Sequence, residues 1–406
     1  MREGSFRLAS PTLTRAVFVL CSLLPFAVHA GEPLHLYTGA VGDMPIVLEL
    51  DLSDPAEISG RYFYEKYHAD LALSGVQEGK ELTLAEGMDD DSGKILPEID
   101  LHQTAQDGWQ GQWTVPGTEG KTLKVVLTEK QFAPPPADAE PGWQAIFKKS
   151  PYDYLRLRDM SLQPGKVQTF MGYTLQWWTE PESKVSMFEV TSGYPPQQGK
   201  LINQQLRARL WDEVVSYHAC LLQGSRFGAD FQQTVTPELL SPAIVSVSVF
   251  TRYDCGGAHP DFGDTPLNLD ATTGKPLSLE DVLWVGDGNP FHYEDHQSSN
   301  EQDASSVSFD TFAEYRSKQF APWLVGQLQA AAPVGMKTPN AEYEDNCDFN
   351  DPDIWDFPAW YFKPKGLYFG PSFARVMRAC EGPDWSVLPY SAVAPHPGSV
   401  ALELPK

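Results

Sequence analysis

The chain has 406 residues, with 54 acidic and 30 basic side chains and a formal net charge of −24 at pH 7. Nucleic acid binding needs clustered Lys and Arg side chains that neutralise phosphates, so this charge excludes a nucleic-acid partner. The acidic charge either serves solubility alone or attracts a cationic partner, and salt would weaken that attraction. A chain of this length exceeds one ordinary hydrophobic core, which predicts two domains.

Residues 1–30 have the pattern of a secretory signal peptide. Basic residues precede an apolar run at 16–28, and the short side chain of Ala30 follows. The run is shorter than the roughly 20 residues that cross a bilayer as a helix, so we expect cleavage after Ala30 and no membrane anchor afterwards. We therefore expect a periplasmic or secreted protein.

In the range 31–131, short segments rich in β-branched and aromatic residues recur at intervals of about 8 to 12 residues. The pattern predicts an all-β domain, an antiparallel meander that closes into a small barrel or sandwich, because closure removes exposed strand edges. The predicted strands are 44–52, 58–64, 70–73, 81–84, 111–113 and 123–127. Prolines between Phe132 and Pro141 then favour an extended connector, and we assign 132–150 as a Pro-rich linker.

Residues 151–400 mix strands with helices. Apolar residues at i, i+4 and i+8 predict a helix over 199–224, and similar spacing predicts a second helix over 309–332. At 244–253 valines alternate with serines, which is the period of a strand covered on one face. The whole predicts an α+β fold, in which an antiparallel sheet carries helices on one face.

An even number of cysteines follows the signal sequence, and exported thiols tend to pair. Of the three possible pairings we expect Cys220–Cys255 and Cys347–Cys380, because each closes a loop of moderate length and leaves the two halves independent. Each bridge would stabilise the fold by roughly 3 to 4 kcal/mol. The cysteine spacing does not favour a metal site, and we expect no cofactor.

The string Tyr-Asp-Cys-Gly-Gly-Ala-His-Pro at 253–260 is the most distinctive part of the chain. The pair Gly256 and Gly257 permits left-handed backbone dihedrals. His259 and Pro260 follow it, and a hydrogen bond of the His259 ring across the turn is the structural interpretation. Downstream, Ser278 and Asp281 have the spacing of a capping box that opens a short helix.

This string resembles the C-terminal domain of the RsiV-like envelope proteins, which occurs in anti-sigma factors and in some peptidoglycan deacetylases. The resemblance covers about 154–393, with 357–362, 366–369 and 385–390 as closing strands. It implies an α+β fold and a non-catalytic binding module, and one family member is a receptor for lysozyme, a cationic protein. The chain departs from the family at 371–380, and it lacks the membrane segment of the anti-sigma factors and the catalytic domain of the deacetylases.

Three other features suggest chemistry. His259 with Asp254 could form an acid–base pair of a hydrolase, which is the enzymatic alternative. His292 and His296 have metal-ligand spacing but lie in a polar stretch that reads as a loop. The acidic run 89–91 before Gly93 has a fragment of a calcium-loop pattern, and a solvated turn is the alternative.

The segment 342–356 combines acidic and aromatic side chains. It could hold calcium, accept a cationic partner with its aromatic residues as anchors, or form a solvated loop pinned by Cys347. Its candidate binding residues are Glu342, Tyr343, Glu344, Asp345, Asp348, Phe349, Asp351, Asp353 and Trp355.

The leading hypothesis is an exported, non-catalytic envelope protein that binds a cationic protein such as lysozyme, or a peptidoglycan component of the cell wall. The alternatives are a hydrolase with its site near His259 and a calcium-stabilised structural module. The sequence leaves the oligomeric state open.

Overall fold

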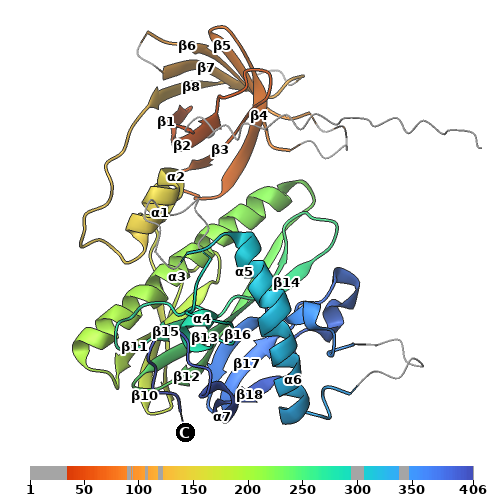
Figure 1. Cartoon of the computed structure of the whole chain (residues 1–406). Helices are drawn as coiled ribbons and strands as arrows, with labels where there is room; N and C mark the ends of the chain where they lie inside the picture. Colours follow the sequence, from red (N-terminus) through yellow and green to blue (C-terminus); the bar gives the residue numbers. More distant parts are fainter. Residues whose placement is uncertain are drawn as a thin grey trace, which may run out of the picture.

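A computed structural model of the chain describes residues 34–88, 93, 95–105, 108–117, 122–293, 306–337 and 347–405. A β-barrel lies at one end of the molecule, and helices α1 and α2 lie between it and a larger α+β part (Figure 1). No helix within these residues is both long and apolar enough to cross a membrane. The expected signal peptide falls outside the described residues.

Eight antiparallel strands close in sequence order into the barrel, and the first pairs with the last. They are β1 (His35–Val41), β2 (Met44–Asp51), β3 (Ile58–Tyr64), β4 (Asp70–Glu78), β5 (Glu81–Glu86), β6 (Glu98–Gln103), β7 (Gly108–Thr114) and β8 (Thr122–Glu129). The predicted all-β domain is confirmed, and of the two expected forms, barrel or sandwich, it has the barrel. The sequence pattern missed β1 and β6. Glycine lets strands approach closely, because a Cβ at Gly39 would overlap the carbonyl oxygen of Val126.

Side chains fill the barrel interior. Apolar residues such as Leu82 and Leu84 alternate along the strands and are buried. The carboxylate of Glu86 accepts a hydrogen bond from the hydroxyl of Tyr62 at 2.5 Å and another from the indole N–H of Trp113 at 2.7 Å. The interior is therefore a packed core with polar groups that satisfy one another.

The connector after the barrel is extended only in its first part. Residues 131–142 form no helix or strand, and α1 (Trp143–Lys149) and α2 (Pro151–Leu157) follow. The expected linker 132–150 is therefore wrong for 143–149. The physical reason is tertiary, because the ring of Trp143 packs against Trp211 at a centroid distance of 6.2 Å.

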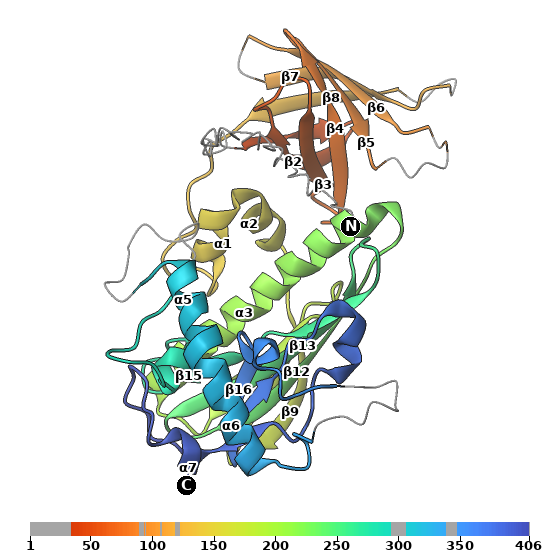
Figure 2. The same cartoon turned by 45° about the vertical axis from the view of Figure 1, so that its right-hand side comes forward.

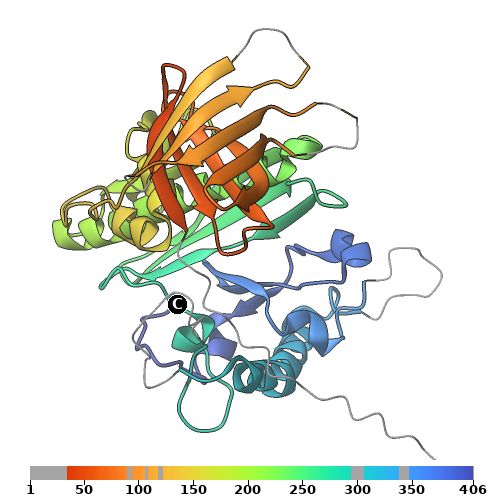
Figure 3. The ribbon, with the colours of Figure 1, turned by 90° about the horizontal axis from the view of Figure 1, so that it is seen from above.

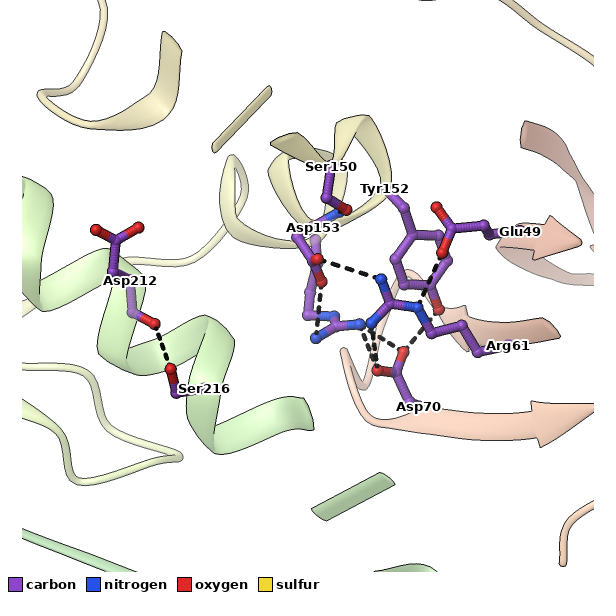
Figure 4. A network of polar contacts seen from close by, with 9 residues as sticks. Glu49, Arg61, Asp70, Ser150, Tyr152, Asp153, Asp212 and Ser216 are labelled. Carbon is purple, nitrogen blue, oxygen red and sulfur yellow. Dashed lines mark hydrogen bonds and ion pairs between the residues drawn. The ribbon is translucent and has the colours of Figure 1, made fainter. Parts of the chain in front are cut away.

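A buried ionic network joins α2 to the barrel (Figure 4). Arg156 pairs with Asp70 of β4 at 2.5 Å, and Arg61 of β3 pairs with Asp153 at 3.2 Å. Burial raises the pKa of Asp70, and the charge of Arg156 opposes that rise. A small apolar cluster accompanies the network, formed by Val47, Phe63, Tyr152 and Leu155.

In the larger part, the long helix α3 (Pro196–Gln223) packs on two antiparallel sheets (Figure 2). The predicted helix at 199–224 is confirmed, and its Leu206, Leu210 and Val214 are buried. One sheet holds β9 (Gln163–Phe170), β10 (Tyr173–Thr179) and β11 (Ser186–Ser192). The other holds β12 (Asp230–Leu240), β13 (Ile244–Asp254), β14 (Asp261–Asp264) and β15 (Leu267–Asp270).

A second layer lies on the side of β12 and β13 away from α3 (Figure 3). Its sheet consists of β16 (Ala359–Lys363), β17 (Gly366–Gly370) and β18 (Val387–Pro389). The predicted helix at 309–332 is present as α5 (Phe309–Tyr315), a π-helical turn η2 (Arg316–Phe320) and α6 (Ala321–Ala331). The shorter helices are η1 (Gly224–Arg226), α4 (Leu279–Val282), η3 (Pro352–Trp355), η4 (Arg375–Cys380) and α7 (Tyr390–Val393).

Both faces of β13 are covered, whereas the sequence pattern predicted a strand with only one face covered. Its valines face α3, and Ser246 on the other face is fully buried. The hydroxyl of Ser246 donates to Asn268 at 2.6 Å and accepts from the N–H of Phe362 at 3.0 Å. Asn268 donates in turn to the carbonyl of Trp360 at 3.0 Å. Polar side chains of the central sheet thus satisfy main-chain groups of β16, and the predicted α+β class is confirmed.

Candidate ligand-binding site

Two disulfides fix the segments around the motif loop, which we define as residues 253–260. They join Cys220 to Cys255 and Cys347 to Cys380, as expected. Gly256 has a φ of +77°, and a Cβ there would lie 2.9 Å from the Cα of Gly224. Gly257 has no positive φ and room for a side chain, so the expectation of left-handed backbone holds for Gly256 alone.

The motif histidine does not close the turn. The carboxylate of Asp254 accepts from the N–H of Gly256 at 3.2 Å. His259 is exposed, and its carbonyl oxygen accepts from the guanidinium of Arg375 at 3.0 Å. Its ring makes no hydrogen bond to any residue that the structure describes, so the interpretation of a bond across the turn is wrong. The structure does not bring Asp254 and His259 together as a hydrogen-bonded pair.

Helix η4 lies against the motif loop. The guanidinium of Arg378 pairs with Asp261 at 3.0 Å and with Glu381 at 3.4 Å, and it donates to the carbonyl of Phe262. A hollow of about 340 Å³ separates η4 from His259 and Pro260. The segment 371–380, where the chain departs from the RsiV-like pattern, therefore forms a wall beside the motif.

A larger pocket of about 490 Å³ adjoins this hollow, and Phe262 lines both. Residues of β13 and β14 line one side of it, and residues of the β16–β17 hairpin line another. Its lining residues are Ser248, Phe250, Phe262, Gly263, Asp264, Ala359, Tyr361, Tyr368, Gly370, Pro371, Glu381 and Gly382. We call this space the sheet pocket.

Asp264 is held rigidly at the sheet pocket. One carboxylate oxygen accepts from the hydroxyl of Ser248 at 2.9 Å, and the other accepts from the N–H of Val249 at 3.0 Å. Burial raises the pKa of Asp264, and these hydrogen bonds oppose the rise. Burial likewise raises the pKa of Glu381 and of Glu238, and the charge of Asp264 adds to the rise at Glu238.

Two tyrosines form an aromatic wall. The rings of Tyr361 and Tyr368 stack with their centroids 4.5 Å apart, and the ammonium of Lys363 lies 4.8 Å from the centroid of Tyr368. Burial, with the charge of Asp264, raises the pKa of Tyr368 to about 12. The sheet pocket therefore combines aromatic walls with carboxylates.

The acidic segment expected to bind a partner is only partly described, because Glu342, Tyr343, Glu344 and Asp345 lie outside the described residues. Asp348 accepts from the N–H of Asn350 in a local turn, and Asp351 accepts from the N–H of Asp353. The rings of Phe349 and Trp385 pack edge to face at 5.0 Å. Trp355 is fully buried in the core, so its expected role as a surface anchor is wrong.

Other aromatic residues lie at the surface near this segment, and sequence reasoning missed them as a group. Phe309 and Phe357 are 51% and 46% exposed, and their rings lie 6.0 Å apart. The i, i+3 spacing of Phe309 and Phe312 is the available sequence signal. We define the aromatic patch as Tyr293, Phe309, Phe312 and Phe357, whose rings contact one another.

Carboxylates border the aromatic patch. Asp310 follows Phe309 and is exposed, as are Asp351 and Asp353. Burial raises the pKa of Asp356, and the charges of Asp353 and Asp351 add to that rise. Beneath the patch the guanidinium of Arg316 is paired with Glu280 at 2.8 Å. The patch therefore has an acidic border.

The suggested metal ligands are separated or undescribed. His292 accepts or donates a hydrogen bond at 3.1 Å with Ser278, whose capping box with Asp281 is confirmed. Residue His296 and the acidic run 89–91 lie outside the described residues. In the part of the chain that the structure describes, no group of His, Cys, Asp or Glu side chains is arranged to hold an ion.

No family model matches the chain, and no curated protein matches it significantly. Among solved structures, the chain is similar to the crystal structure of a DUF3298 family member from Bacteroides fragilis, with 13% identity over 61% of this chain and 90% of that one. The TM-score is 0.28, which does not establish a common fold.

Proposed function

We propose that this is an exported, non-catalytic envelope protein that binds a cationic protein through the aromatic patch and its acidic border. The observation that carries the proposal is the exposure of Phe309 and Phe357 beside the carboxylates of Asp351, Asp353 and Asp356. Contiguous exposed aromatic residues are typical of protein-binding surfaces, where aromatic side chains supply most of the binding energy.

Charge supports the nature of the partner. The chain carries a net charge of −24, and Arg316, whose guanidinium lies against the rings of Phe312 and Phe357, is paired with Glu280. A basic partner would approach faster at low salt and would relieve the repulsion between the border carboxylates. The disulfides and the signal-like residues 1–30 support work outside the cytoplasm.

The proposal is tested by titrating the protein with a basic lysozyme at low and high salt. We expect saturable binding that weakens with salt, and a loss of affinity of about tenfold or more when Phe309 and Phe357 are both replaced by Ala. The matched control is Phe227→Ala, which removes a phenylalanine that is 69% exposed elsewhere.

Two outcomes contradict the proposal. One is the absence of saturable binding to the basic protein at low salt. The other is binding that the double substitution leaves unchanged. Binding to peptidoglycan fragments that the double substitution leaves unchanged would instead favour a cell-wall ligand at another site.

A further inference from the structure

We infer that the sheet pocket binds a small ligand with a primary ammonium group on an alkyl chain, independently of the aromatic patch. Aromatic side chains on both sides leave room for the alkyl part, and Asp264 and Glu381 face the same space. The site belongs to neither the motif loop nor the acidic segment.

Two aromatic surfaces, one from each of two separate sheets, line the space that an alkyl chain would occupy. The rings of Phe250 on β13 and Phe262 on β14 contact each other diagonally, with their centroids 5.7 Å apart. Tyr361 and Tyr368 stack on the hairpin of β16 and β17. Burial of each methylene between such surfaces is favourable by about 0.8 kcal/mol. A pocket of about 490 Å³ holds a short chain with a polar end.

The charges select a cation. The lining includes two carboxylates, those of Asp264 and Glu381, and no Lys, Arg or His. Arg378, at the rim, is engaged by Asp261 and Glu381, so its charge is balanced. Lys363 lies over the tyrosine rings and has Glu238 as a counter-charge. Glu381 is already paired with Arg378, so Asp264 is the carboxylate that a cationic ligand would meet, and an anionic ligand would be repelled by it.

Asp264 is prepared for an ammonium group. Each of its oxygens accepts one hydrogen bond within the protein and keeps a second lone pair for a ligand. Its position is fixed before binding, so little ordering cost remains. The raised pKa of Asp264 reflects a buried negative charge that a cation would stabilise. The charged and titratable groups around it are Arg209, Glu238, Tyr361, Lys363 and Tyr368.

The test compares n-pentylamine with 1-pentanol, which has the same chain and no charge, by NMR or calorimetric titration of the protein from residue 31 onwards. We expect pentylamine to bind and pentanol to bind at least about tenfold more weakly, because a charge-assisted hydrogen bond is lost. Asp264→Asn and Glu381→Gln should each weaken pentylamine binding by about tenfold. Glu57→Gln, at an exposed position of the barrel, is the matched control.

Three outcomes would overturn the inference. The first is equal binding of the two ligands, and the second is no binding of pentylamine up to 10 mM, roughly the millimolar limit of useful affinity. The third is full binding of pentylamine to the Asp264→Asn variant. The Phe309→Ala/Phe357→Ala variant separates the two proposals. It should retain pentylamine binding whether or not the aromatic patch binds a protein.

Discussion

Arg156 of α2 and Asp70 of β4 form an ion pair in which each side chain is only 1% exposed. The barrel therefore meets the rest of the chain at a charged, buried contact that neighbouring groups stabilise. Arg61 stacks over the ring of Tyr152 at 4.3 Å, and Tyr152 donates to Asp70 at 2.6 Å. Buried pairs of this kind are sensitive to the loss of one member, because the other charge then lacks compensation.

Replacing Arg156 with Met should lower the free energy of unfolding by roughly 3 kcal/mol or more, since Asp70 would lose its nearest counter-charge. The control is Arg158→Met, one residue beyond α2, whose pair with Asp159 is exposed and should contribute less than about 1 kcal/mol. Urea unfolding measures both. Similar losses for the two variants would contradict the assigned role of the buried network.

His218 should make stability depend on pH. Burial, aided by the charges of Arg156 and His68, lowers its pKa to about 2. The unfolded chain binds a proton near the ordinary value of 6.5, whereas the fold binds it only near 2, so protons favour unfolding between these values. The stabilising contribution is fully present above about pH 6.5 and falls by up to about 1.4 kcal/mol per unit below it.

The check is to measure the free energy of unfolding from pH 7.5 to 5 for the wild type and for His218→Gln. The variant should lose less stability on acidification than the wild type. The control is His102→Gln, on an exposed position of β6, which should keep the wild-type slope. Parallel profiles for wild type and His218→Gln would show that this imidazole titrates equally in both states.

The two motif glycines should respond differently to alanine. Gly256→Ala should destabilise the protein by roughly 1 to 3 kcal/mol, because the residue has a φ of +77° and close backbone contacts. Gly257→Ala should change stability by no more than about 0.5 kcal/mol. Thermal unfolding of the two variants side by side tests this, and equal effects would contradict the assigned geometry.

Asp264→Asn should stabilise the protein at pH 7 by roughly 1 kcal/mol. The folded state raises the pKa of this carboxyl, so the fold favours the neutral form and stability falls as the pH rises from the unfolded to the folded pKa. An amide keeps an acceptor for the N–H of Val249 and carries no charge. Denaturant unfolding should show the gain at pH 7 and its disappearance at acidic pH. A loss at pH 7 would indicate a structural carboxylate.

Local patterns were sufficient to predict the class of each half of the chain. Strand and helix periods depend on neighbours in sequence, so the strands of the N-terminal domain could be inferred from their spacing, and α3 from residues such as Leu206 and Leu210. The disulfide pairing could be predicted from the loop lengths together with the expectation of export. The helix α1 was missed because Trp143 is held by Trp211, a contact over a long sequence separation.

The sequence by itself determined an acidic α+β chain with an N-terminal all-β domain and a preferred disulfide pairing, because composition and periodicity are local properties. Tertiary structure decided which segment covers the serine face of β13. It also decided that Asp264 and Tyr368 line one pocket, and that Trp355 lies in the core while Phe357 is exposed. A side-chain period shows which face of an element is apolar, but burial and charge environment depend on the distant segment that packs against it.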